Sequence, residues 1–165
     1  MGADAAGVAA TVVATDERAT AVGAAGHRVD LERWRALAAG VLADEGVGGP
    51  AELNLVFVDE TAMAELNGEF MSATGPTDVL SFPLDAEAEP GPGATLRLLG
   101  DVVICPAVAA RNAGANAGYD AEIALLVVHG VLHVLGMDHA EDDEAAAMVA
   151  RERHHLAAVG LERRP

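Results

Sequence analysis

The stretch AEIALLVVHGVLHVLGMDH, residues 121–139, decides the fold and most of the chemistry of this chain. Residues 121–136 are apolar nearly all round, which predicts a buried helix at the centre of the domain. Gly136 can adopt the left-handed conformation that ends a helix and turns the chain sharply. We therefore expect a central helix that stops at Gly136.

Outward from this helix, periodicity and turn residues predict a mixed α/β fold. Strands are expected at 8–14, 53–58, 79–82 and 99–105, and further helices at 30–46, 61–70, 107–117 and 141–160. We predict a single domain over residues 1–165, with a small, mostly four-stranded sheet packed with about five to six helices. The segments 1–7 and 86–97 are expected to be flexible.

Composition limits the class of protein. The chain has 165 residues, enough for one domain with a real core, and a formal net charge of −16. Such a surface repels phosphate backbones and by itself argues against a nucleic-acid binder. A single cysteine, Cys105, excludes an internal disulfide and is compatible with the cytosol. No apolar stretch approaches the roughly 20 residues of a membrane helix, and no secretory signal is expected.

Three histidines in the opening stretch have a spacing suited to a metal ion. His129 and His133 are one helical turn apart on the same face, so both imidazoles can point at one ion. The turn at Gly136 can bring His139 back beneath them. Three neutral imidazoles leave one position of a tetrahedral zinc open for water, and bound zinc lowers the pKa of that water to about 7. We expect one zinc per chain on these histidines, with a zinc-activated water as the nucleophile, although nickel, cobalt and copper also bind such sites.

A structural role for these histidines is the alternative. A single histidine on an apolar helix more often bonds to a carbonyl than to a metal, and two at this spacing can arise by chance. Burying three imidazoles without a partner costs on the order of several kcal/mol, which favours the metal site.

The spacing H-x-x-x-H-x-x-G-x-x-H is also that of metzincin-type zinc proteases. Those enzymes carry a glutamate directly after the first histidine as the general base, whereas this chain has Gly130 there. Peptide hydrolysis is therefore only an alternative. Phosphodiester cleavage depends less on such a residue, because a metal can supply both the nucleophile and charge stabilisation.

The segment HGVLHVLGMDH (129–139), with PTDVLSFP (76–83), LGDVVIC (99–105) and AELN (64–67), resembles the YbeY family of bacterial endoribonucleases and rRNA maturation factors. The resemblance covers roughly residues 50–160. It implies one α/β domain, a single zinc on the three histidines and a cytoplasmic location. It also implies cleavage of single-stranded RNA, maturation of small-subunit rRNA and ribosome quality control. The implied partners are ribosomal RNA and the small ribosomal subunit with its proteins; neither DNA nor a membrane is expected.

The chain departs from this family at Met71, where the family often has an arginine that is credited with a role in RNA cleavage. Methionine cannot replace the bidentate phosphate contact of a guanidinium group. Arg97, Arg111 or a ribosomal partner could supply the missing charge. The departure leaves a non-catalytic, zinc-stabilised ribosome-assembly factor open as a second function, and a metallopeptidase as a weaker third.

Five further polar residues are candidates for binding substrate or orienting a ligand histidine: Thr77, Asp78, Ser81, Asp101 and Asp138. The first three either line the cleft or only stabilise the turn after Pro76. Asp101 either accepts a proton from a ligand imidazole or simply begins a strand, and Asp138 is either a second acceptor or a helix cap.

The general base is not identified by any motif. The acidic residues 141–144 are best explained as charges favoured at the beginning of a helix, although one of them could be the base. His154 and His155 are expected to be surface or helix-end residues and not ligands.

Overall fold

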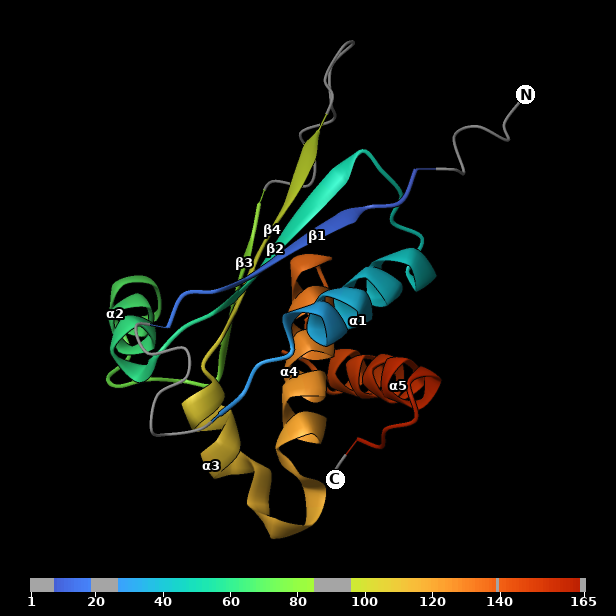
Figure 1. The fold of residues 1–165 in the computed structure, drawn as a ribbon. Coiled ribbons are helices and arrows are strands. Elements are labelled where there is room, and N and C mark those ends of the chain that lie inside the picture. The colour runs from blue at the N-terminus through green and yellow to red at the C-terminus, as the bar shows by residue number, and fades with distance from the viewer. Residues whose placement is uncertain (1–7, 19–26, 85–95, 139, 164–165) are drawn as a thin grey trace, which may run out of the picture.

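The computed structural model describes residues 8–18, 27–84, 96–138 and 140–163. These parts of the chain form four strands and five helices (Figure 1). In chain order the elements are β1 Thr11–Asp16, α1 Leu31–Asp44, β2 Ala51–Phe57, α2 Glu60–Met71, β3 Val79–Pro83, β4 Arg97–Ile104, α3 Pro106–Ala117, α4 Tyr119–Val134 and α5 Asp142–Ala158. The predicted fold class is confirmed, with the histidine helix as α4.

The sheet is mixed and has the strand order β1-β2-β4-β3. β1 runs parallel to β2, β2 runs parallel to β4, and β3 pairs antiparallel with β4. β3 is thus an edge strand, and in its register Ser81 lies opposite Val102. β3 pairs with a neighbouring strand on one side only, and the site described below lies beside this strand.

The larger hydrophobic core lies on the face of the sheet that carries α1, α4 and α5 (Figure 1). β2 supplies Leu53, Leu55 and Phe57, which alternate with half-buried residues and are fully buried. Burying each of these side chains contributes about 1.5–3 kcal/mol. α4 crosses this face beneath β4 and β3 and buries residues on most of its circumference, as its apolar sequence predicts.

A smaller core lies on the opposite face. Met63 of α2 packs there with Leu80 of β3 and Val103 of β4. α2 begins at an N-cap, Asp59, whose side chain accepts a hydrogen bond from the Ala62 amide, and it ends at Met71. At the end of α2, the Phe70 ring contacts Phe82 of β3, with ring centroids 5.1 Å apart, so this end of the helix lies beside the edge strand.

Gly130 lets α4 approach the sheet closely. A Cβ atom at this position would come within 2.4 Å of Val102 Cγ1 in β4. The Ser81 hydroxyl donates a hydrogen bond of 3.1 Å to the Gly130 carbonyl, which joins β3 to α4. The close approach at Gly130 and the hydrogen bond from Ser81 together fix how near α4 lies to the sheet and how it is rotated where it carries its histidines.

The element boundaries differ from the predicted ones at a few places. The first strand covers Thr11–Asp16 and not 8–14, because Ala9 makes only an isolated bridge with Gly48 and regular pairing with β2 begins at Thr11. Arg97, placed by prediction in a flexible segment, begins β4, where its amide donates to the Pro50 carbonyl at 3.0 Å. The rest of that segment as far as 95, and residues 1–7, lie outside the described residues. Within the described ranges, no helix is long and apolar enough to cross a membrane.

Candidate metal centre

A cleft of about 530 Å³ lies between the end of α2, the edge strand β3 and α4. It is lined by Met71, Val79, Leu80, Ser81, Pro83, His129, His133 and Asp138. Four of the residues singled out in the sequence, His129, His133, Ser81 and Asp138, therefore meet in one hollow.

His129 and His133 lie together on α4, as their spacing predicts. Their ring centroids are 4.4 Å apart and the ring planes are inclined at 77°. Both side chains line the cleft and are partly exposed in it. The third predicted ligand, His139, lies outside the described residues. The convergence of all three imidazoles on one ion stays a prediction.

Glu152 of α5 is hydrogen-bonded to the His129 ring. Its Oε1 lies 2.8 Å from His129 Nδ1, and its other oxygen accepts from Arg163 Nε. Burial works to raise the pKa of the Glu152 carboxyl, but the hydrogen bonds from His129 and Arg163 outweigh it, so the pKa is lowered. Glu152 is therefore an ionised carboxylate at neutral pH, although only 1% of its surface is exposed.

This pair determines which nitrogen of His129 can bind a metal. A carboxylate only accepts hydrogen bonds, so Nδ1 carries the proton and a neutral ring has its lone pair on Nε2. A carboxylate behind a histidine is the usual second partner of a metal-binding imidazole, and it raises the basicity of the ring. The donor set at the cleft thus fits a zinc-type ion, with His129 presenting Nε2 to it.

Thr77, Asp78 and Asp101 have partners elsewhere and are not among the described residues that line the cleft. Asp78 Oδ1 accepts from the Val79 amide at 2.8 Å and from the Thr77 hydroxyl at 3.4 Å, which is the turn-stabilising arrangement. Asp101 lies within β4 and accepts from Asn54 Nδ2 at 2.9 Å. Of the candidates around this strand, Ser81 alone reaches both the cleft and α4.

The position that carries the general base in metzincin proteases faces the sheet here. A Cβ at Gly130 would meet Val102 at 2.4 Å, as described above, so a glutamate at this position would collide with β4. The arrangement of α4 against the sheet therefore leaves no room for a protease-type base at this point.

Met71 lies at the rim of the cleft, with 49% of its surface exposed. Neither Arg97 nor Arg111 replaces a basic group there: Arg111 pairs with Glu60 at 2.5 Å, and neither of the two lines the cleft. Among the described lining residues, only the histidines can carry positive charge.

Glu152 was missed in the sequence, although a signal exists. It lies between Met148 and Leu156, each four residues away on α5, and all three side chains are buried. A charged residue inside an apolar stripe needs a buried partner, and a histidine in the neighbouring helix is a natural one. The acids that were considered instead, residues 141–144, are exposed at the beginning of α5.

Comparison with known proteins points in one direction. The family described as Endoribonuclease YbeY matches residues 23–160. A protein from Salinispora tropica named Endoribonuclease YbeY is 46% identical over 141 residues, which cover 80% of this chain and 89% of the relative. One of the same name from Thermobifida fusca is 50% identical over 137 residues, covering 80% and 87%. The solution structure of TM1509 from Thermotoga maritima matches with a TM-score of 0.53 and 30% identity over 76% of this chain and 77% of that one.

Proposed function

Because the chain belongs to the YbeY family of endoribonucleases, we propose that it cleaves single-stranded RNA with a zinc-activated water in the cleft between β3 and α4. The observation that carries the proposal is the buried carboxylate of Glu152 behind His129. A buried charge is costly unless it is paired, and Glu152 is paired both with Arg163 and with a ring that lines the cleft.

His129 and His133 would hold the ion together with His139, three residues after Gly136 in the sequence. A zinc ion bound by three imidazoles supplies a water that is ionised near neutral pH and a positive charge beside the scissile phosphate. The residues of the chain act around it. Glu152 keeps the Nε2 lone pair of His129 available, and the Ser81–Gly130 hydrogen bond holds α4 at its distance from β3.

The charge of the cleft makes RNA binding dependent on the ion. The described lining residues include Asp138 but neither arginine nor lysine, and the protein carries a net charge of −16. A phosphate backbone is repelled by such a surface. The ion is then the principal attraction for phosphate, so its removal should reduce RNA binding as well as cleavage.

The direct test is digestion of a labelled RNA offered as a single strand and as a duplex. The zinc-loaded protein should cut the single strand only. Cleavage should be lost after treatment with a chelator, in His129→Ala and in His133→Ala, and should return on adding zinc to the stripped wild type. His27→Ala removes a histidine outside the cleft and should cut normally. Undiminished cleavage by stripped or His129→Ala protein would exclude the mechanism.

The cellular role that we propose is maturation of small-subunit rRNA and ribosome quality control in the cytoplasm. The proposal rests on the family membership. Cells depleted of the protein should accumulate an unprocessed precursor of small-subunit rRNA. Wild-type protein should remove this precursor, whereas His133→Ala should not.

A second function, a zinc-stabilised ribosome-assembly factor without catalysis, is favoured by one observation. Met71 lies at the rim of the cleft, and the described lining residues include neither an arginine nor a lysine. On this alternative, chelation would lower the melting temperature while the zinc-loaded protein cut neither the single strand nor the duplex. The same digestion therefore decides between the two.

A further inference from the structure

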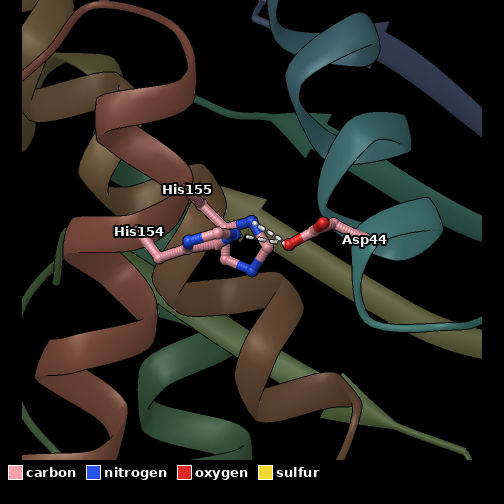
Figure 2. A group of neighbouring side chains, drawn as sticks. All are labelled: Asp44, His154 and His155. Carbon is pink, nitrogen blue, oxygen red and sulfur yellow. Dashed lines mark hydrogen bonds and ion pairs between the residues drawn. The ribbon is translucent and has the colours of Figure 1, made fainter.

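A second group of metal-binding side chains lies outside the cleft, where the end of α1 meets α5. Asp44 is the last residue of α1, and His154 and His155 are on α5 (Figure 2). One ligand atom from each residue lies within 4.8 Å of the other two. His155, expected to be a surface or helix-end residue, lies in the last turn of α5 but is only 4% exposed, whereas Asp44 and His154 are about half exposed. None of the three lines the cleft.

The carboxylate of Asp44 is the centre of the group. Its Oδ2 lies 2.7 Å from His154 Nε2 and 3.8 Å from His155 Nδ1. Two imidazole nitrogens and a carboxylate oxygen are suitable ligands for zinc and its neighbours in the first transition row. The two exposed side chains can shift slightly to admit an ion, while the buried ring of His155 stays fixed.

Glu45 orients His155 in the way that Glu152 orients His129. Its Oε2 lies 2.6 Å from His155 Nε2, so this nitrogen carries the proton. In a neutral ring the lone pair is then on Nδ1, which faces Asp44. At 3.8 Å these two acceptors are too far apart to be joined directly by a hydrogen bond, and a cation between them would bind both. A carboxylate behind the ring also raises its basicity as a ligand.

The surroundings favour a cation and allow it to enter. Asp44 and Glu45 lie at the C-terminal end of α1, where the helix dipole disfavours negative charge. Arg151 compensates part of this charge: its principal contact is with Glu45, and it also lies 3.3 Å from the Asp44 Oδ2 that faces the histidines. A cavity of about 360 Å³, lined in part by Gly40, Ala158 and all three candidate ligands, opens beside the group.

We propose that Asp44, His154 and His155 bind a second divalent transition-metal ion, of the zinc type, with one or more waters completing its shell. The ion ties the end of α1 to α5, the helix whose Glu152 holds His129. The site therefore braces the support of the cleft without taking part in it. It does not depend on the proposed RNA cleavage.

The test uses the full chain carrying His129→Ala and His133→Ala, which removes two ligands of the cleft site. Stripped protein is titrated with Co²⁺ and followed by the visible absorption of the bound ion, with Zn²⁺ as competitor. One equivalent should bind. Adding His154→Gln or Asp44→Asn should weaken it by at least about tenfold, because losing a ligand should cost no less than losing an outer partner. Asp143→Asn, an exposed charge change on the same helix, should leave it unchanged.

Absence of Co²⁺ binding in the double variant, or binding that neither His154→Gln nor Asp44→Asn weakens, would overturn the proposal. If the double variant does not fold, the wild type serves instead. The wild type should then bind two equivalents of Co²⁺, and the single variant His154→Gln should bind one. Binding of one equivalent by both proteins would also overturn the proposal. RNA digestion is measured separately, so failure of the second site is distinguishable from failure of the cleft mechanism.

Discussion

Replacing Glu152 should weaken zinc binding in the cleft without touching a ligand. In the wild type the carboxylate accepts from His129 Nδ1 at 2.8 Å and fixes the tautomer that presents Nε2. Loss of such an outer partner costs about 10–100-fold in metal affinity, which is about 1.4–2.7 kcal/mol. Glu152→Gln keeps an acceptor for the ring and loses the charge, so it should lie near the weaker limit. Glu152→Ala frees the ring and should lie near the stronger one.

The substitution also removes the buried partner of Arg163, and its effect on folding must be measured separately. Arg163 is partly exposed and can turn to solvent, so we expect a loss of about 1–3 kcal/mol in the free energy of unfolding. Unfolding by urea with the metal removed measures this quantity. Zinc affinity is then measured on the folded protein by competition with a coloured chelator.

The matched control is Glu144→Gln, which removes one exposed charge from the first turn of the same helix. Its zinc affinity should be that of the wild type. Should Glu152→Ala, shown to be folded, bind zinc as tightly as the control, then Glu152 does not orient a ligand, and the assignment of His129 Nε2 loses its support.

Three other changes bear on the packing, the charge and the pH dependence of the protein. In Gly130→Ala the new methyl group meets Val102, which should lower the free energy of unfolding by about 1–3 kcal/mol. The higher helix propensity of alanine should offset about 1 kcal/mol of this loss. In the double variant with Val102→Ala, urea unfolding should show a total loss smaller than the sum of the two single losses. Met71→Arg should increase the slope of log Kd against log salt for single-stranded RNA by about 0.7, and an unchanged slope would mean that the rim is not on the path of the RNA. Hydrogen bonds from Arg18 lower the pKa of Asp16 in the folded state. The stability that this pair contributes is therefore complete above the unfolded-state pKa of about 4, and it is lost as the pH falls through the lower pKa of the folded state. Asp16→Asn should therefore cost about 1 kcal/mol near pH 7 and almost nothing near pH 2 in urea unfolding, and an equal cost at both pH values would contradict this.

Local patterns in the sequence account for most of the fold. The apolar run that predicts α4 and the short-range periodicity that predicts β2 and α1 each act over a few residues, and the structure confirms all three elements. The strand order does not follow from such patterns, because the insertion of β4 between β2 and β3 depends on how the faces pack in three dimensions. The predicted limits of the first strand were wrong for the same reason, since they are set by its pairing with β2.

Only the part of the site that lies within one helix could be predicted from the sequence. The neighbouring positions of His129 and His133 follow from helical spacing, whereas Glu152 comes from another helix and becomes visible only when α5 is packed against α4. The pairing of Asp101 with Asn54 depends likewise on strand register, which a single strand does not specify. His155 lies in the last turn of α5, as expected for a helix-end residue, but its burial depends on the end of α1 and could not be predicted from one helix.

The most direct measurement is a crystal structure of the zinc-loaded protein with anomalous data collected on both sides of the zinc absorption edge. One peak should lie in the cleft, about 2.0–2.1 Å from a ring nitrogen of each of His129, His133 and His139, with Nε2 as the ligand atom of His129. A cleft without a peak at full zinc loading, or a peak bonded through His129 Nδ1 with Glu152 turned away, would contradict the mechanism proposed for this chain.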